Sequence, residues 1–190
     1  MTDVSAIILA GGISSRMGVN KAELTWKGST LLEHQVNKVR RLGIDDIIVA
    51  GYPKHIDGTS FAADRYPRKG PLGGIHAGLL AANHPHCLVL SVDAPLVPPD
   101  TLTALIEAHI EKSNSITILS HGWMTEPLMG VYERELCPIA DEILRSDNTS
   151  VRVLFKKVGL STFEYHGDES LLFNCNTPAE YCALLSAATV

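Results

Sequence analysis

The sequence has no excess of positive charge: its 16 Lys and Arg residues are outnumbered by 21 Asp and Glu residues, which gives a net charge of −5. A protein whose main partner is a nucleic acid uses basic side chains to neutralise the phosphate backbone. The shortage of such side chains argues against a nucleic-acid partner. A small anionic ligand is still compatible with the composition, because a few well-placed Lys and Arg residues suffice to bind it.

Long apolar runs and secretory signals are also missing. No run of about 18 apolar residues is present, so we expect no membrane span. Asp3 stands where a signal peptide has a basic region, and the apolar run Ala6–Ala10 is too short for one. The four cysteines show no CxxC spacing, which is typical of reduced thiols in a cytosolic protein. These absences predict a soluble cytoplasmic protein.

The sequence does contain enough apolar material for one well-packed domain. Apolar residues make up 45% of the chain and charged residues 19%, a balance that allows a sizeable core and argues against disorder. A length of 190 residues suits one domain better than two. No internal repeat, low-complexity tract or linker divides the sequence. We therefore expect a single domain over residues 1–190.

Strand-length apolar runs alternate with segments of helical period. Val4–Ala10 is a continuous apolar run, as expected for a parallel strand buried on both faces. Thr30 and Glu33 have the spacing of a helix capping box, and Gly43 stands where that helix would end. Further strands are predicted at Asp46–Ala50, Phe61–Asp64, Cys87–Val92, Ser115–Ser120 and Pro127–Tyr132. Further helices are predicted at Gly73–Asn83, from an N-cap at Asp100, at Glu135–Arg145, at Ser150–Val158, and from Pro178 after an N-cap at Thr177. This alternation predicts an α/β fold: a single three-layer domain with a mostly parallel, doubly wound, Rossmann-like sheet.

The first predicted strand ends in a glycine-rich loop, and ligands of an open α/β sheet bind beyond the carboxyl ends of its strands. Gly11 and Gly12 let the backbone approach a ligand, and consecutive free N–H groups in such a loop can hold phosphate oxygens. Arg16 and Lys21 add positive charge. The spacing fits neither a P-loop nor a Rossmann dinucleotide loop. The loop is therefore interpreted as a phosphate-binding loop of another kind or, since double glycines are common in turns, as an ordinary turn.

Polar residues in three other segments each have two interpretations. Asp93 follows a buried strand, where it suits a Mg²⁺ ligand or an Asx turn before a Pro-rich loop. Asp64 can accept hydrogen bonds from a base or ribose, while the Arg and Lys residues after it also suit a solvated loop. Asn174 and Asn176 can reach one ligand or satisfy their own loop. The histidines have no metal-binding spacing, and no base near Cys175 is implied that would make it a nucleophile.

These segments together resemble a known family. The pattern LAGGxSxRMGxxK over residues 9–21 resembles the signature loop of nucleotidyltransferases with a glycosyltransferase-A-like (nucleotide-diphospho-sugar transferase) fold. The patterns GPLGG at 70–74, DxP at 93–95 and NxNTP at 174–178 narrow the resemblance to the molybdenum cofactor guanylyltransferases, the MobA family. The resemblance covers essentially the whole chain.

The resemblance implies a GTP site and an acceptor site. It implies GTP contacts for Leu9, Ala10, Gly11, Gly12, Lys21, Asp64 and Asp93. Among these, Lys21 would contact the phosphates, Asp64 the guanosine, and Asp93 both the nucleotide and a Mg²⁺ ion. Asn174 and Asn176 would contact the pterin substrate or complete the metal site.

The implied reaction is attack by the phosphate of molybdopterin on the α-phosphorus of GTP. It forms molybdopterin guanine dinucleotide and releases pyrophosphate. Arg16, Lys21 and Asp93 are the expected catalytic residues, which act by positioning the reactants and neutralising charge. No general base is needed, because the attacking phosphate is already ionised near neutral pH. The role of the family also implies transient contact with cofactor-insertion chaperones.

Three positions depart from the family pattern, and three alternative functions are also considered. Ala50-Gly51 replaces a polar strand end, Glu126 replaces a familiar histidine, and Cys175 replaces an aliphatic residue.

One alternative is a molybdopterin cytidylyltransferase, which usually has Ala-Ala-Gly in the first loop and no GPLxG segment. The others are another small nucleotidyltransferase and a non-catalytic, nucleotide-binding regulatory module. The presence of Arg16, Lys21 and Asp93 favours an enzyme over the regulatory module.

Overall fold

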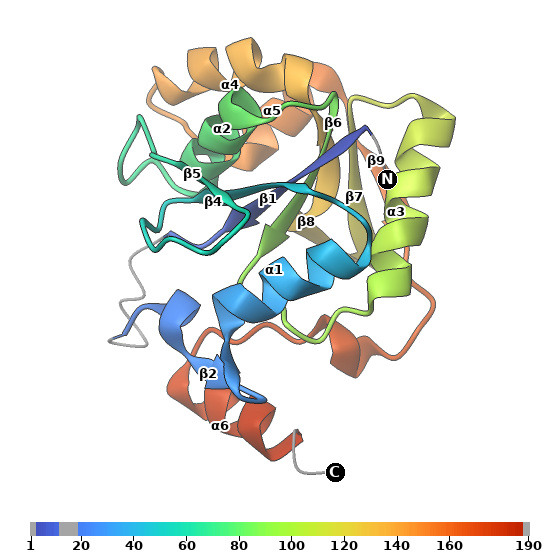
Figure 1. Cartoon of the computed structure of the whole chain (residues 1–190). Helices are drawn as coiled ribbons and strands as arrows, with labels where there is room; N and C mark the ends of the chain where they lie inside the picture. The colour runs from blue at the N-terminus through green and yellow to red at the C-terminus, as the bar shows by residue number, and fades with distance from the viewer. Residues whose placement is uncertain (1–2, 12–18, 188–190) are drawn as a thin grey trace.

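A seven-stranded sheet in the order β5-β4-β1-β6-β8-β7-β9 runs through the computed structural model, which describes residues 3–11 and 19–187 (Figure 1). Its strands are β1 (Val4–Leu9), β4 (Asp46–Ala50), β5 (Ser60–Ala62), β6 (His86–Ser91), β7 (Ile116–His121), β8 (Met124–Glu133) and β9 (Ser161–Glu164). Of these strands, only β8 runs antiparallel to its neighbours. The mostly parallel α/β sheet predicted from the sequence is confirmed.

Strand β1 lies at the centre of the parallel half of the sheet. Its neighbours are β4 and β6, and its last residue, Leu9, pairs with Ala50 on one side and Ser91 on the other. All six residues of β1 are buried, which explains the uninterrupted apolar run. The carboxyl ends of β1, β4 and β6 therefore meet at one edge of the sheet.

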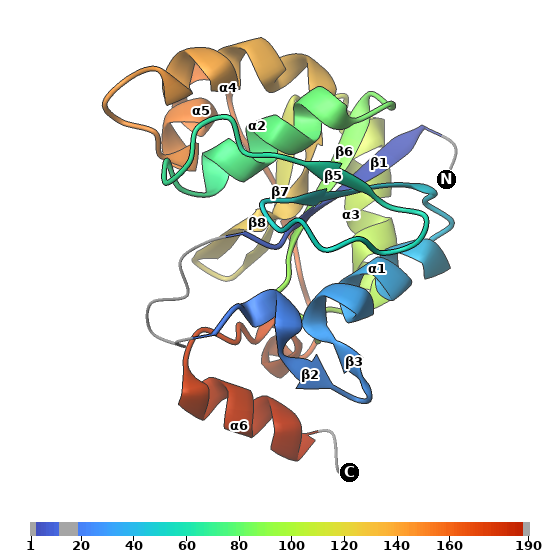
Figure 2. The same cartoon turned by 60° about the vertical axis from the view of Figure 1, so that its left-hand side comes forward.

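Helices cover both faces of the sheet and complete the three layers (Figures 1 and 2). Helices α1 (Leu31–Arg41) and α3 (Pro99–Lys112) pack on one face, and α2 (Pro71–Ala81), α4 (Cys137–Leu144) and α5 (Val151–Val158) pack on the other. Each face has its own buried apolar cluster, as a sheet covered on both sides requires. A short 3₁₀ turn, η2 (Arg134–Leu136), precedes α4.

The predicted helix starts are partly right. The capping box of Thr30 and Glu33 is present in α1, and Thr177 accepts a 3.3 Å hydrogen bond from the Glu180 backbone N–H ahead of α6 (Pro178–Ala187). The prediction that Asp100 caps α3 is wrong: the helix begins at Pro99, with Pro98 as its N-cap. Proline suits the first helical position because its fixed φ is helical and no N–H is needed there.

A small unit lies beyond the carboxyl edge of the sheet (Figure 2). The two-stranded hairpin of β2 (Thr25–Trp26) and β3 (Ser29–Thr30) packs there with α6, and neither β2, β3 nor β9 was predicted. Trp26 and Cys175 are buried in this unit, and the Trp26 indole N–H donates to the Leu184 carbonyl at 3.2 Å. This contact joins an early segment of the chain to its last helix.

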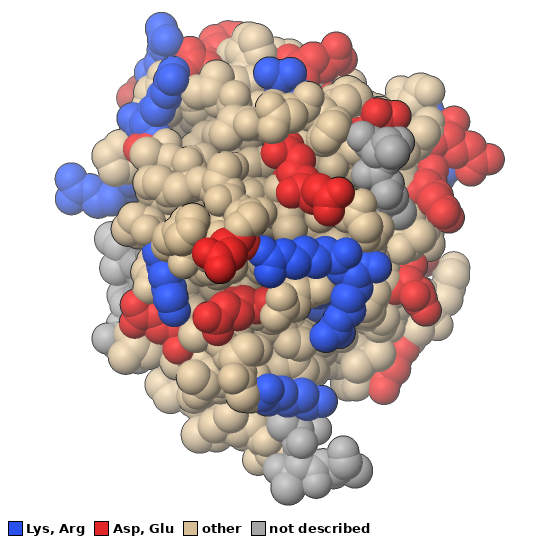
Figure 3. All heavy atoms as spheres, in the orientation of Figure 1, with Lys and Arg blue, Asp and Glu red and all other residues tan. Residues whose placement is uncertain are grey.

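One face of the surface shows charges of both signs, and the cysteines are unpaired. On the face drawn in Figure 3, Lys and Arg residues are interspersed with Asp and Glu and form no basic stripe. All four cysteines are free thiols, as predicted. Among the described residues, no helix has both the length and the apolar character needed to cross a membrane.

Candidate active site

The carboxyl edge of the parallel strands gathers most of the residues expected to bind a ligand. Gly11 follows β1, Gly51 follows β4, and Asp64 lies two residues beyond β5. Asp93 follows β6 by two residues on the same edge. Gly12 and Arg16 of the first loop lie outside the described residues.

Gly11 passes so close to Gly51 that neither position has room for a side chain. A Cβ on Gly11 would lie 2.8 Å from the Gly51 Cα, and Gly51 has a φ of +81°. The Ala10 and Gly11 N–H groups both donate to the Ala50 carbonyl, at 3.0 and 3.1 Å. This close approach accounts for the glycine after β4, and it means that these two N–H groups are already hydrogen-bonded within the protein.

Lys21 joins two of the predicted site segments. It begins the 3₁₀ turn η1 (Lys21–Glu23), whose N-cap side chain comes from Asn20. Its Nζ donates to Asp93 Oδ2 at 3.1 Å and to Asn176 Oδ1 at 2.6 Å. The Lys21 and Asp93 side chains are only 16% and 19% exposed. Residues from three distant parts of the sequence, each a candidate binding residue, thus form one polar cluster.

Helix α1 holds the turn that carries Asp93. The Gln35 amide donates to the carbonyls of Ser91 and Ala94 at 2.8 and 3.0 Å. Lys38 Nζ donates to the Pro95 carbonyl at 2.7 Å, and His34 Nε2 donates to the same oxygen at 3.2 Å. These contacts fix the direction of the backbone at Asp93.

Burial sets the protonation of the two basic residues in that contact. It lowers the pKa of Lys38 to about 7, with the charge of Arg41 adding to the effect. Burial also lowers the pKa of His34 to about 4, so this ring is neutral near pH 7. A neutral imidazole can still donate its Nε2–H to the Pro95 carbonyl.

Glu126 and Asn174 lie beside this cluster. The Asn174 amide and Glu126 Oε2 are 3.5 Å apart. Burial raises the pKa of Glu126, and the charge of Asp93 adds to the increase. Glu126 reaches this edge because β8 runs in the opposite direction and therefore begins here.

A cavity of about 380 Å³ opens next to Asp93 and between the two asparagines. Its walls include Asp93, Glu126, Asn174 and Asn176, together with Arg152 from the first turn of α5. The two asparagines therefore face one cavity although they have different hydrogen-bond partners. Asp93 and Asn176 also accept hydrogen bonds from Lys21, so the cavity adjoins the polar cluster.

Asp64 lies on the same edge but some distance from Asp93. Its carboxylate accepts a 2.8 Å hydrogen bond from the Tyr66 N–H and packs over the first turn of α2, where a Cβ on Gly73 would lie 2.8 Å from it. Three strand spacings separate β5 from β6, which corresponds to roughly 14 Å. Gly74 packs against Leu9 in turn, so the GPLGG segment fits α2 closely against β1 and Asp64.

The donor set around Asp93 suits a hard divalent cation. Asp93 and Glu126 offer carboxylate oxygens, and Asn176 offers an amide oxygen, which are the ligand types that Mg²⁺ prefers. The Lys21 ammonium now lies between Asp93 and Asn176. Its position shows that this part of the site favours positive charge.

Two residues of this site were not found in the sequence as binding residues. Glu126 stood out only as a departure from a family pattern, and no motif marked Arg152 as a binding residue. Both are far from Asp93 in sequence, and only the reversal of β8 and the placement of α5 bring them to the cavity.

The fold is shared with solved structures of nucleotidyltransferases. A nucleotidyl transferase from Methanothermobacter thermautotrophicus superposes with a TM-score of 0.77 at 20% identity, over 99% of this chain and 98% of that one. The molybdopterin-guanine dinucleotide biosynthesis protein A from Archaeoglobus fulgidus superposes with a TM-score of 0.80 at 21% identity, over 98% of each chain. At these identities the likeness establishes the fold.

Sequence similarity narrows this class to a family. The family model for the MobA-like NTP transferase domain matches residues 6–161, and the chain belongs to that family. A probable molybdenum cofactor guanylyltransferase from Carboxydothermus hydrogenoformans is 32% identical, over 97% of this chain and 96% of its own length. NTP transferases of this family typically use a divalent metal ion.

Proposed function

We propose that this chain transfers GMP from GTP to the phosphate of molybdopterin, forming molybdopterin guanine dinucleotide and releasing pyrophosphate. The observation that carries the proposal is the cluster of Lys21, Asp93 and Asn176, which unites three of the motifs predicted to form the site. The relative from Carboxydothermus hydrogenoformans, which bears the name of this activity, supports the choice of substrates.

GTP would lie along the carboxyl edge of the sheet, from Asp64 to Asp93. The separation of roughly 14 Å between the strands that carry them suits a nucleoside at one end and a phosphate chain at the other. Leu9, Ala10 and the exposed Gly11 would form the floor between them. Because the Ala10 and Gly11 N–H groups bind Ala50, phosphate donors are expected from Gly12 and the residues that follow it.

In the reaction, an acceptor phosphate oxygen forms a bond to the α-phosphorus as the bond to the bridging oxygen of pyrophosphate breaks. Lys21 and Arg16 would neutralise the charge on the phosphate chain and on the departing pyrophosphate. Asp93 would hold Mg²⁺, and Asn176 and Glu126, which line the same cavity, would offer further oxygen ligands. When bound, Mg²⁺ supplies charge neutralisation at the phosphates.

The acceptor would enter the cavity beside Asp93. Asn174 and Asn176 offer amide groups for pterin contacts, and Arg152 offers a positive charge for the acceptor phosphate. We further propose that the whole chain, residues 1–190, forms one nucleotidyltransferase domain that acts in the cytoplasm. The free state of all four thiols supports that location. Contact with cofactor-insertion chaperones stays a prediction.

Calorimetric titration with GTP, CTP, ATP and UTP in the presence of Mg²⁺ tests the nucleotide specificity. We expect GTP to bind most tightly, and Lys21→Ala to weaken GTP binding about tenfold or more, because a charge-assisted contact is lost. Lys112→Ala, an exposed lysine at the end of α3, is the matched control. A preference for CTP would assign the cytidylyltransferase activity instead, and equal binding in Lys21→Ala would remove Lys21 from the phosphate site.

A further inference from the structure

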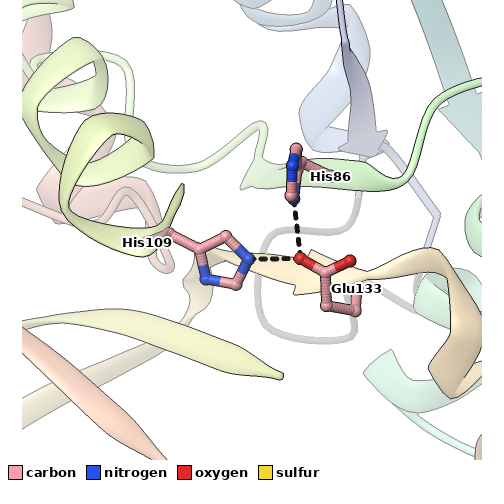
Figure 4. A group of neighbouring side chains, drawn as sticks. All are labelled: His86, His109 and Glu133. Carbon is pink, nitrogen blue, oxygen red and sulfur yellow. Dashed lines mark hydrogen bonds and ion pairs between the residues drawn. The ribbon is translucent and has the colours of Figure 1, made fainter. Parts of the chain in front are cut away.

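Three potential metal ligands converge at the edge of the sheet opposite the candidate active site. His86 begins β6, Glu133 ends β8, and the sheet register pairs these two residues directly. His109 approaches from the last turns of α3. His86 Nδ1 and His109 Nε2 each lie 2.7 Å from the same oxygen, Glu133 Oε1 (Figure 4).

This cluster is separate from the proposed nucleotide site. His86 stands at the amino end of β6, whereas Asp93 lies beyond its carboxyl end, so roughly 20 Å of extended chain separates the two. A cation bound at the His86 end therefore cannot contact nucleotide phosphates beside Asp93.

The inner histidine is held in one orientation. The His109 ring is 1% exposed, and its Nδ1 lies 3.0 Å from the Thr117 hydroxyl. This contact leaves Nε2 as the nitrogen that faces His86 and Glu133. Metal-binding histidines typically have such a partner on the second ring nitrogen, which fixes the orientation of the ring.

The outer part of the cluster is open to solvent. The side chains of His86 and Glu133 are 24% and 17% exposed. An ion could therefore enter from the solvent, and a water molecule could complete its coordination. Two histidines and one carboxylate with an open position are a ligand set that proteins use for Zn²⁺.

Hydrogen bonds alone also account for the contacts of Glu133 with the two histidines. The distances between the three ligand atoms show how far these atoms would have to move to bind a metal ion. Ligand atoms of a tetrahedral zinc site lie about 3.4 Å apart, given metal–ligand distances near 2.1 Å. The present nitrogen–oxygen distances of 2.7 Å would have to increase by less than 1 Å. His86 is partly exposed and stands at the first position of its strand, so we expect its side chain to accommodate this change.

We propose that His86, His109 and Glu133 bind a transition-metal dication such as Zn²⁺, with water completing the coordination. Two imidazole nitrogens favour Zn²⁺, Co²⁺ or Ni²⁺ over Mg²⁺, which prefers oxygen ligands. The bound ion would join α3 to β6 and β8 and so stabilise the amino edge of the sheet.

Zn²⁺ titration of the metal-free protein, followed by calorimetry and thermal unfolding, tests the proposal. We expect one Zn²⁺ per chain at this site, and a rise in Tm of about 5–10 °C at a free Zn²⁺ concentration near 100 times Kd. His86→Asn and Glu133→Gln should each weaken binding at least tenfold. His84→Asn, on the preceding loop, and Asp93→Asn, in the nucleotide site, should leave it unchanged.

Several results would overturn the proposal. These are wild-type affinity in His86→Asn, loss of binding in Asp93→Asn, or no binding at 100-fold excess Zn²⁺ over protein. If circular dichroism shows that Glu133→Gln does not fold, the Zn²⁺ affinity of His86→Asn, at the more exposed position, tests the proposal by itself. The absorption spectrum with Co²⁺ gives a second measurement: nitrogen and oxygen ligation supports the site, whereas a thiolate charge-transfer band assigns the binding to cysteine.

Discussion

Lys21 contacts two other candidate site residues, and we propose that it also contacts GTP. Its ammonium group donates to the carboxylate of Asp93 and to the amide oxygen of Asn176. Phosphates would compete for the same ammonium. GTP binding would therefore weaken the Lys21–Asp93 contact and leave the Asp93 carboxylate available to a divalent cation.

Replacement of Asp93 by alanine tests the proposed role in metal binding. We expect turnover to fall at least ~10²-fold, on the scale of losing one strong electrostatic element, with the fold unchanged. Steady-state formation of the dinucleotide product, alongside a circular dichroism spectrum, measures both. Asp45→Ala, at an exposed position before β4, is the control. Turnover near the wild-type value in Asp93→Ala would exclude Asp93 as the metal ligand.

At the residue scale, the motifs that contain Lys21, Asp93 and Asn176 could be singled out from the sequence, but the contact between these residues could not. Lys21, Asp93 and Asn176 belong to short motifs at strand or helix ends, where the position of a residue in the fold follows from local sequence. Arg152 and the histidine cluster do not. His86, His109 and Glu133 have no metal-binding spacing along the chain; the pairing of β6 with β8 and the packing of α3 bring them together.

Among the elements, α1 has the most direct influence on the site. Three of its side chains, those of His34, Gln35 and Lys38, bind backbone carbonyls between Ser91 and Pro95. A helix that covers the sheet thus also determines the position of the turn after β6. Movement of α1 relative to the sheet would shift Asp93.

The lowered pKa of Lys38 makes the free energy of unfolding of the protein dependent on pH. Burial lowers its folded-state pKa to about 7 from an ordinary value of 10.5. Between these values the unfolded chain binds more protons than the folded protein, so the free energy of unfolding rises with pH. Below pH 7 both states are protonated, and the cost of burying the charge is fully present.

Lys38→Met should remove that dependence. Relative to the variant, the wild-type protein should gain about 2 kcal/mol of stability between pH 7 and pH 9. Urea unfolding of both proteins at several pH values measures the difference. Lys112→Met, on the exposed end of α3, is the matched control. A constant difference between wild type and Lys38→Met across this range would contradict the lowered pKa.

The sequence predicted elements best where they are buried on both sides. Strands β1, β4 and β6 appear as continuous apolar runs because neighbouring strands and two helical layers enclose them. Strand β9 escaped prediction because it is a short edge strand with alternating burial. The start of α3 was misplaced at Asp100 because two consecutive prolines precede it, and Pro99 itself begins the helix.

At the scale of the whole molecule, the close fit of α2 against β1 sets the thickness of one layer. A Cβ on Gly78 would overlap the Ile7 side chain. Gly78→Ala should therefore lower the free energy of unfolding by about 1–3 kcal/mol through overpacking, despite the better helix propensity of alanine. Chemical denaturation measures this change, and Gly122→Ala, where φ is +57° and a Cβ would meet no neighbour, gives the cost of left-handed backbone strain without overpacking. A stabilised Gly78→Ala protein would show that the layers separate easily.

The salt bridge and hydrogen bond of Lys21 also have a consequence for how the site forms during synthesis. Lys21 and Asn176 are separated by 155 positions, and the Cys175 N–H donates to the Asp93 carbonyl at 2.7 Å. A ribosome-bound chain can form β1, β4 and β6 early, but it lacks Asn176 until the segment after β9 has been translated. We therefore expect a nascent chain stalled between β9 and residue 174 to contain all seven strands of the sheet and yet to lack the two asparagines of the proposed site.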